Sequence, residues 1–223
     1  MKKNLRVIIS GGGTGGHIFP AIAIANTIKS RFPDSRILFV GAEGRMEMEK
    51  VPAAGYDIIG LDIAGFNRQN PFKSFSSIWK FRKALKKAGK VIKDFDPHIV
   101  VGVGGYASAP ILYKANALKI PTLVQEQNSY AGLTNKFLAK KASVICVAYD
   151  GMDRFFPKDK IVLTGNPCRE ELLSPSIKRE DAYAEFNLDP AKKTLLVIGG
   201  SLGSRTINKS LLSNIDTLSK SDV

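Results

Sequence analysis

The residues best suited to chemistry lie in a glycine-rich segment near the start of the chain. Residues 10–17 (SGGGTGGH) follow a short apolar run and precede a helical pattern that opens at Pro20. Glycines allow a backbone to approach a ligand closely, and the first turn of a helix presents unpaired N–H groups and the positive end of its dipole. The segment therefore predicts a loop that binds an anion.

Two further loops follow predicted strands. Residues 104–106 (GGY) come directly after the apolar run 98–103, and residues 125–128 (QEQN) come after the run 122–124. In a parallel sheet the carboxyl ends of all strands lie at one edge, so the three loops are expected to converge there. Three convergent loops predict a binding site.

Two side chains in these loops are candidates for a general base. His17 ends the first loop, where its imidazole could take a proton from a hydroxyl group. Glu126 lies in the third loop and competes for the role, although its carboxylate could equally brace the loop. The choice between them stays open. His98, the other histidine, starts a buried strand after Pro97 and is expected to be structural.

Around these loops, short apolar runs alternate with helical patterns, which predicts an α/β fold with a doubly wound, Rossmann-like parallel sheet covered on both faces. Near residue 161 the pattern starts again, with the apolar run 194–198, a glycine loop and a helix from about Arg205. We therefore predict a domain at 1–160, and at 161–223 a linker and the beginning of a second Rossmann-like domain. The strands expected in the first domain are 5–9, 36–40, 58–62, 98–103, 122–124 and 143–148, and its helices are 20–31, 74–93, 108–118 and 131–140.

The charge balance favours anionic partners. The chain has 33 Lys and Arg residues against 20 Asp and Glu, a formal net charge of +13, which attracts phosphorylated ligands, nucleic acid or an anionic bilayer. Aromatic residues near the start of the helix expected at 74–93 lie among lysines, as in a membrane-surface anchor, although an ordinary amphipathic helix with a basic side has the same pattern. This aromatic-basic patch consists of Phe72, Lys73, Phe75, Trp79 and Lys80.

The chain has no secretory core and no stretch approaching the roughly 20 apolar residues of a membrane span. Its two cysteines, Cys146 and Cys168, form no disulfide framework or metal-type pair and are expected to be buried thiols in a reducing compartment. The sequence therefore predicts a cytoplasmic protein whose contact with the membrane is peripheral.

Five motifs, taken together, resemble those of one family. This is the family of undecaprenyl-diphospho-muramoylpentapeptide β-N-acetylglucosaminyltransferases, the peptidoglycan enzymes that make lipid II from lipid I. The motifs run through the whole chain in the family's order. They are GGTGGHIFPA at 12–21, GVGGY at 102–106, EQN at 126–128 with AGLTNK at 131–136, GNPCR at 165–169 and GGSLG at 199–203.

The resemblance implies a GT-B fold of two Rossmann-like domains, the first for lipid I and the second for UDP-GlcNAc. It also implies an inverting transfer without a metal or other cofactor, no nucleic-acid partner, and a place on the cytoplasmic face of the membrane. His17 or Glu126 would take the proton of the acceptor's C4 hydroxyl. By position, the donor contacts would be Thr14, Gly15, Gly16, Asn128, Arg169 and Ser201, and the acceptor diphosphate would meet Gly13, Gly104, Gly105 and Tyr106.

Two features limit this resemblance, and two other classes of protein compete with it. Gln125 stands where the family often has a histidine. The uridine- and sugar-binding part of the donor domain would lie beyond Val223, so the chain is expected to be inactive alone.

An NAD(P)-dependent oxidoreductase would also fit, because Gly11, Gly13 and Gly16 match G-x-G-x-x-G, but no acidic residue ends the second expected strand. A non-enzymatic module that binds polyanions or membranes would leave the three loops unexplained.

Overall fold

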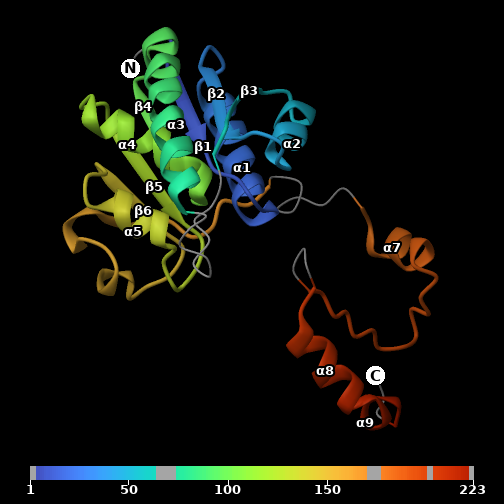
Figure 1. Ribbon diagram of the computed structural model, residues 1–223. Coiled ribbons are helices and arrows are strands. Elements are labelled where there is room, and N and C mark those ends of the chain that lie inside the picture. Colours follow the sequence, from blue (N-terminus) through green and yellow to red (C-terminus); the bar gives the residue numbers. More distant parts are fainter. Residues whose placement is uncertain (1–3, 64–73, 170–176, 200–202, 221–223) are drawn as a thin grey trace. The chain divides into compact units, whose positions relative to one another are not determined.

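Seven parallel strands form a sheet in the order β3-β2-β1-β4-β5-β6-β7 (Figure 1). The structure is a computed structural model that describes residues 4–63, 74–169, 177–199 and 203–220. All six ladders of the sheet are parallel, as the alternation of apolar runs and helices predicted. The strands are β1 (Arg6–Ser10), β2 (Arg36–Ala42), β3 (Asp57–Leu61), β4 (Ile99–Gly102), β5 (Thr122–Glu126), β6 (Val144–Val147) and β7 (Ile161–Leu163).

Helices cover both faces of this sheet because its strands are apolar on both sides. In β1, Val7 and Ile9 pack with α1 and α2, whereas Ile8, which points the other way, packs with α3, α4 and α5. The two buried clusters make a core of three layers, helices–sheet–helices. The covering helices are α1 (Gly15–Arg31), α2 (Glu47–Ala53), α3 (Ser74–Phe95), α4 (Ala109–Ala117) and α5 (Leu133–Ala139), and short 3₁₀ turns lie at η2 (Tyr106–Ser108), η3 (Met152–Arg154) and η4 (Lys158–Lys160).

Helix α1 begins at Gly15, earlier than the expected start at Pro20. Thr14 has an extended backbone and its carbonyl oxygen accepts hydrogen bonds from the N–H groups of His17 and Ile18, at 3.1 and 3.2 Å. These bonds nucleate the first turn despite the poor helix propensity of glycine, so Pro20 lies inside the helix. The correction places His17 on the first turn of a helix rather than in a loop before it.

Strand β7 corrects the expected domain boundary at residue 160. Ile161 pairs with Ile145 of β6, so the segment that was expected to open a second domain instead completes the first sheet. The physical reason is that the short connection through η3 and η4 brings this apolar run back beside β6, where Ile161 packs against the core of the first sheet. The described chain divides into two compact units at a later point, Met1–Arg169 and Glu170–Val223.

The second unit contains the helices α7 (Arg179–Glu185), α8 (Arg205–Ser213) and α9 (Ile215–Ser219). The helix expected near Arg205 is confirmed, and the side chain of Ser204 caps it by accepting the N–H of Ile207 at 3.3 Å. The prediction of a strand at 194–198 is wrong, because this stretch is irregular and largely exposed. A strand needs a neighbour to pair with its backbone, and the described residues of this unit provide none.

Candidate active site

The three loops predicted to converge meet at the carboxyl edge of the sheet. The strand order reverses at β1, with β2 and β3 on one side and β4 to β7 on the other. Open α/β sheets bind ligands outside the strand ends at such a switch point, and the loops that follow β1 and β4 flank it. The fold therefore places the candidate residues where a ligand is expected.

The first two loops pack so closely that glycine is required between them. A Cβ atom added to Gly105 would lie 2.3 Å from the carbonyl oxygen of Gly12, and one added to Gly104 would lie 2.9 Å from Cε1 of His17. Both Gly104 and Gly105 have positive φ angles, +100° and +77°. The backbones of the two loops and the imidazole of His17 therefore lie in close contact, next to the ring of Tyr106.

The N-terminus of α1 offers unpaired donors to an anion. Thr14 makes no side-chain hydrogen bond as the N-cap, and the N–H groups of Gly15 and Gly16 have no carbonyl group one turn earlier to bind. Gly13, Thr14 and Gly16 are exposed, so solvent reaches this end of the helix. This geometry suits a phosphate group.

Glu47 is a site residue that sequence reasoning missed. Its carboxylate is fully buried, with Oε2 accepting the N–H of Gly13 and Oε1 accepting the N–H of Ala42, both at 3.0 Å. A Cβ on Gly12 would lie 2.0 Å from Glu47 Oε1. The N–H of Gly13, expected to meet the acceptor diphosphate, is therefore already occupied. The available signal was a carboxylate a few residues after the second strand.

His17 joins the first loop to the third. Its Nδ1 lies 3.1 Å from Oε1 of Gln127, and the ring is partly buried. Gln127 is 9% exposed and donates from Nε2 to the carbonyl oxygen of Val103 at 2.8 Å. Sequence reasoning placed Gln127 in a motif but gave it no role.

Glu126 is held inside the third loop by four donors. Its Oε1 accepts the backbone N–H and the side-chain Nδ2 of Asn128, both at 3.1 Å. Its Oε2 accepts the N–H of Gly132 at 3.0 Å and Nδ2 of Asn135 at 2.9 Å. These bonds fill the roughly four lone-pair sites of a carboxylate, and Glu126 is only 1% exposed. The arrangement is that of a brace for the loop.

The loop after β7 reaches the same edge. Asn166 donates from Nδ2 to the carbonyl oxygen of Gln127 at 3.3 Å, and the guanidinium carbon of Arg169 lies 5.0 Å from the centre of the Phe19 ring. Arg169 thus stacks over the first turns of α1, where a cation would add to the field of the helix N-terminus. Ser201, the other expected phosphate contact, lies outside the described residues.

The aromatic-basic patch is described only in part. Trp79 on α3 is 70% exposed. The ammonium group of Lys80 lies 2.9 Å from the carboxylate of Asp62, and this hydrogen bond is the main reason that the pKa of Asp62 is lowered. Lys80 is therefore already paired with an anion. Phe72, Lys73 and the side chain of Phe75 lie outside what the structure describes.

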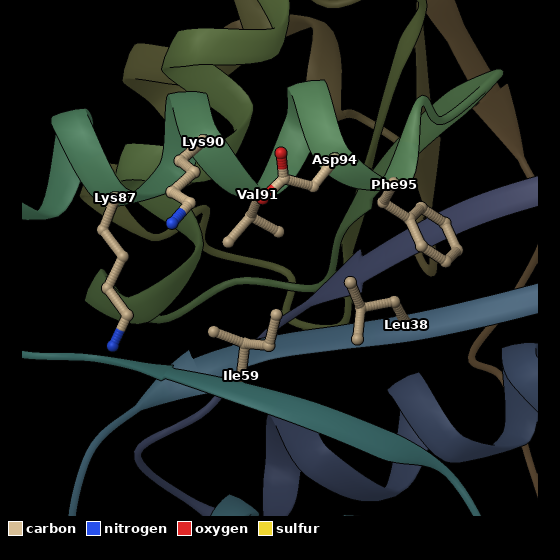
Figure 2. Close-up of a pocket in the computed structure, with 7 residues that line it drawn as sticks. All are labelled: Leu38, Ile59, Lys87, Lys90, Val91, Asp94 and Phe95. Atoms are coloured by element: carbon tan, nitrogen blue, oxygen red, sulfur yellow. The ribbon is translucent and has the colours of Figure 1, made fainter.

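A cavity of about 390 Å³ lies between α3 and the strands β2 and β3 (Figure 2). Leu38, Ile59 and Val91 line it with apolar surface, and Lys87 and Lys90 point along its rim. No residue of the three loops lines this cavity, so it is separate from the candidate site.

Within the described residues, no group of His, Cys, Asp and Glu side chains is arranged to hold a metal ion. No helix in that part of the chain is long and apolar enough to cross a membrane. The expectation of two buried thiols is wrong for Cys168, which is exposed in the loop after β7, while Cys146 is partly buried in β6.

The class of protein follows from a match to a family model. Residues 7–147 match the N-terminal domain of glycosyltransferase family 28, and the chain belongs to this family. Its fold is α/β of the GT-B type, as expected from the motifs.

The chain is also similar to relatives with more specific names. It is 62% identical over 221 residues to the UDP-N-acetylglucosamine--N-acetylmuramyl-(pentapeptide) pyrophosphoryl-undecaprenol N-acetylglucosamine transferase of Phocaeicola vulgatus, and 60% identical to that of Parabacteroides distasonis. Each match covers 99% of this chain, but the chain spans only 59% and 60% of the two relatives.

Solved structures agree with this family. MurG of Acinetobacter baumannii superposes with a TM-score of 0.61 at 31% identity, covering 77% of this chain and 48% of that one. UDP-GlcNAc 2-epimerase of Neisseria meningitidis, at 15% identity and a TM-score of 0.63 over 96% of this chain and 62% of that one, shares the fold. Glu43 follows β2 directly, so its position does not exclude the dinucleotide alternative, but the family match over residues 7–147 argues against it.

Proposed function

We propose that this chain forms the acceptor-side part of an inverting glycosyltransferase. The enzyme transfers GlcNAc from UDP-GlcNAc to the C4 hydroxyl of MurNAc in undecaprenyl-pyrophosphoryl-MurNAc-pentapeptide (lipid I), and the product is lipid II of peptidoglycan synthesis. The observation that carries the proposal is the placement of an imidazole beside the open N-terminus of α1, in a chain 62% identical to a relative named for this transfer.

His17 is the base in this proposal. Its imidazole takes the proton of the C4 hydroxyl as that oxygen attacks the anomeric carbon of GlcNAc. The bond from the anomeric carbon to the diphosphate oxygen breaks, and UDP leaves with the electron pair, so the configuration inverts. Glu126 is less suited, because both of its oxygens already accept two hydrogen bonds.

Charge on the departing UDP would be balanced by cationic and dipolar groups of the protein, without a metal or cofactor. The N–H groups of Gly15 and Gly16 and the guanidinium of Arg169 are the groups that this chain offers. Thr14, Asn128 and Ser201 would add donor contacts, and Gly104, Gly105 and Tyr106 would line the acceptor diphosphate. The 223-residue chain is expected to be inactive alone, because it spans only part of the relatives.

The aromatic-basic patch is proposed to meet an anionic membrane surface on the cytoplasmic side, where a lipid-linked acceptor would be presented. The exposed Trp79 and the net charge of +13 support this part of the proposal. No nucleic-acid partner is proposed.

Turnover by the full-length protein tests the choice of base. In His17→Ala, kcat is expected to fall about 10²–10⁴-fold, while the affinity for UDP-GlcNAc stays within a few-fold, because only proton transfer is lost. Initial rates with radiolabelled UDP-GlcNAc and lipid I measure kcat, and equilibrium binding of UDP-GlcNAc measures the affinity.

Glu126→Gln is the matched control for this test. It keeps the size of the side chain and removes its basicity, but its NH₂ group would face two of the four donors that Glu126 accepts. The variant is therefore expected to lose some stability, while the fraction that is folded retains most of its kcat. Near-normal turnover in His17→Ala together with collapse in Glu126→Gln would transfer the role to Glu126. Full activity in both variants would show that neither residue is the base.

A further inference from the structure

We propose that Gln127 sets the tautomer of His17, so that the neutral imidazole carries its proton on Nδ1 and keeps a free electron pair on Nε2. Gln127 is thus a positioning residue for the base. The catalytic part of this inference rests on the proposed function, whereas the tautomer itself can be measured without any activity.

The acceptors around Nε2 determine the orientation of the Gln127 amide. Its Nε2 lies 2.8 Å from the carbonyl oxygen of Val103, and a carbonyl oxygen can only accept, so the NH₂ group must point there. The same nitrogen also donates to Oε1 of Gln125. Both hydrogens of the NH₂ group therefore have acceptors, and the flipped amide would turn its oxygen toward two other oxygens.

This orientation determines which ring nitrogen of His17 carries the proton. With its nitrogen committed, the Gln127 amide presents Oε1 to Nδ1 of His17 at 3.1 Å. An amide oxygen has no proton to give, so Nδ1 must be the donor. A neutral imidazole has only one N–H, and Nε2 is left as the acceptor. The backbone carbonyl of Val103 thus determines, through Gln127, which ring nitrogen can act as a base.

The position of the ring supports this arrangement. A Cβ on Gly104 would lie 3.0 Å from Nδ1 and 2.9 Å from Cε1 of His17, so the imidazole edge rests directly against the glycine backbone. The opposite tautomer would set the electron pair of Nδ1 against Oε1 of Gln127. It would also make Nε2 a donor, which cannot accept the proton of a hydroxyl group.

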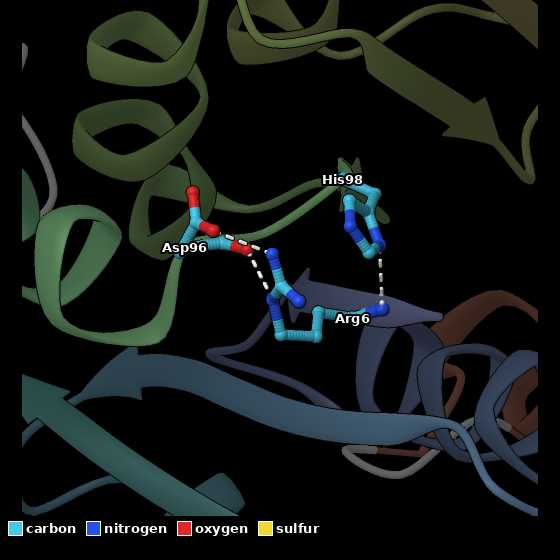
Figure 3. Close-up of polar contacts among 3 residues, drawn as sticks. All are labelled: Arg6, Asp96 and His98. Atoms are coloured by element: carbon cyan, nitrogen blue, oxygen red, sulfur yellow. Dashed lines mark hydrogen bonds and ion pairs between the residues drawn. The ribbon is translucent and has the colours of Figure 1, made fainter. Parts of the chain in front are cut away.

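His98 provides an internal reference with the opposite arrangement (Figure 3). The backbone N–H of Arg6 donates to Nδ1 of His98 at 3.1 Å, so the proton of this neutral ring must sit on Nε2. The chain has only two histidines. A nitrogen spectrum of the imidazoles therefore contains one ring of each predicted tautomer.

Long-range ¹H–¹⁵N correlation spectra of the ¹⁵N-labelled chain test the inference at about pH 8.5, well above the ordinary histidine pKa of about 6.5. We expect a protonated Nδ1 for His17 and a protonated Nε2 for His98. In Gln127→Leu, the His17 signals should move toward the Nε2-protonated form, because the acceptor is gone. His98 should be unchanged in this variant.

An unprotonated Nδ1 on His17 in the unaltered chain would overturn the inference, and so would an unchanged His17 spectrum in Gln127→Leu. In the full-length enzyme, Gln127→Leu should lower kcat at least about tenfold with little change in KM for UDP-GlcNAc, because a wrong tautomer impairs the base without removing a substrate contact. If His17→Ala keeps its turnover, the assignment of His17 as the base fails, and the spectra still decide the tautomer.

Discussion

The two edges of the sheet use their polar residues differently. At the amino edge, His98 accepts the backbone N–H of Arg6, and the Arg6 side chain donates to the carbonyl oxygen and the carboxylate of Asp96 (Figure 3). Four buried polar atoms have no partner within the described part of the chain. Ser35 Oγ lies just before β2 at the amino edge, whereas Tyr106 Oη, Gln125 Nε2 and Asn135 Oδ1 lie at or beside the carboxyl edge.

This difference fits the proposal that the carboxyl edge is the functional one. The contacts drawn at the amino edge join one chain segment to another. At the carboxyl edge, hydrogen-bonding capacity is left over beside the open first turn of α1. Unsatisfied buried polar groups are rare in folded proteins, and three of the four described here lie on the side of the sheet where the glycine loops meet.

The largest effect is expected where the loops of the carboxyl edge touch. Gly105→Ala should destabilise the fold by at least about 3 kcal/mol, because the new methyl group would collide with the carbonyl oxygen of Gly12 at a positive φ angle. Gly151→Ala is the matched control: its φ is +70° but open space surrounds it, so about 1 kcal/mol is expected. Urea unfolding of the chain measures both, and equal losses would show that the loop contact is not tight.

An intermediate effect is expected at the amino edge. His98→Ala should cost about 1–3 kcal/mol of unfolding free energy, because the N–H of Arg6 loses its acceptor, while turnover of the full-length protein stays near normal. His98→Asn, which can place an oxygen near the former Nδ1, should recover part of the loss. A large fall in kcat for His98→Ala would erase the distinction between the two edges.

The smallest effect is expected for the exposed ion pair between Arg6 and Asp96. Asp96→Asn removes the charge but keeps a residue that tolerates the φ of 50°, so the loss should be below about 1 kcal/mol. Urea unfolding at low and high salt is the measurement, and the difference between the two proteins should shrink as salt screens the pair. A loss that persists in high salt would indicate a contribution from hydrogen bonding rather than charge.

The sequence predicted the sheet and the convergence of the loops because apolar runs that alternate with helices allow few arrangements. It did not predict α2, because a short helix that contains Pro52 leaves no periodic signal. Glu47 was missed for the same reason. The site contacts themselves were also beyond sequence reasoning, since His17 and Gln127 are 110 residues apart and meet only through the sheet.

Two apolar runs show how hydrogen-bonding partners decide whether such a run becomes a strand. Residues 161–163 and 194–198 both have the composition of strands, yet only the first forms one. The first run has the open edge of β6 beside it, whereas the second has no described strand to pair with. Intrinsic preference for the extended form is weak, and hydrogen-bonding neighbours determine the result.

The strand order has a consequence for how the chain assembles. Every ladder but one joins strands that follow each other in sequence, and the exception is β1 with β4. That ladder is the seam between two locally connected halves, and it closes a loop running from Ser10 to Ile99. His17 follows the strand on one side of the seam, and Gln127 belongs to the half on the other side. Neither half contains both His17 and Gln127. The pairing of β1 with β4 closes the longest loop in the sheet and first brings these two residues together, so the chain loses the loop-closure entropy in that same step.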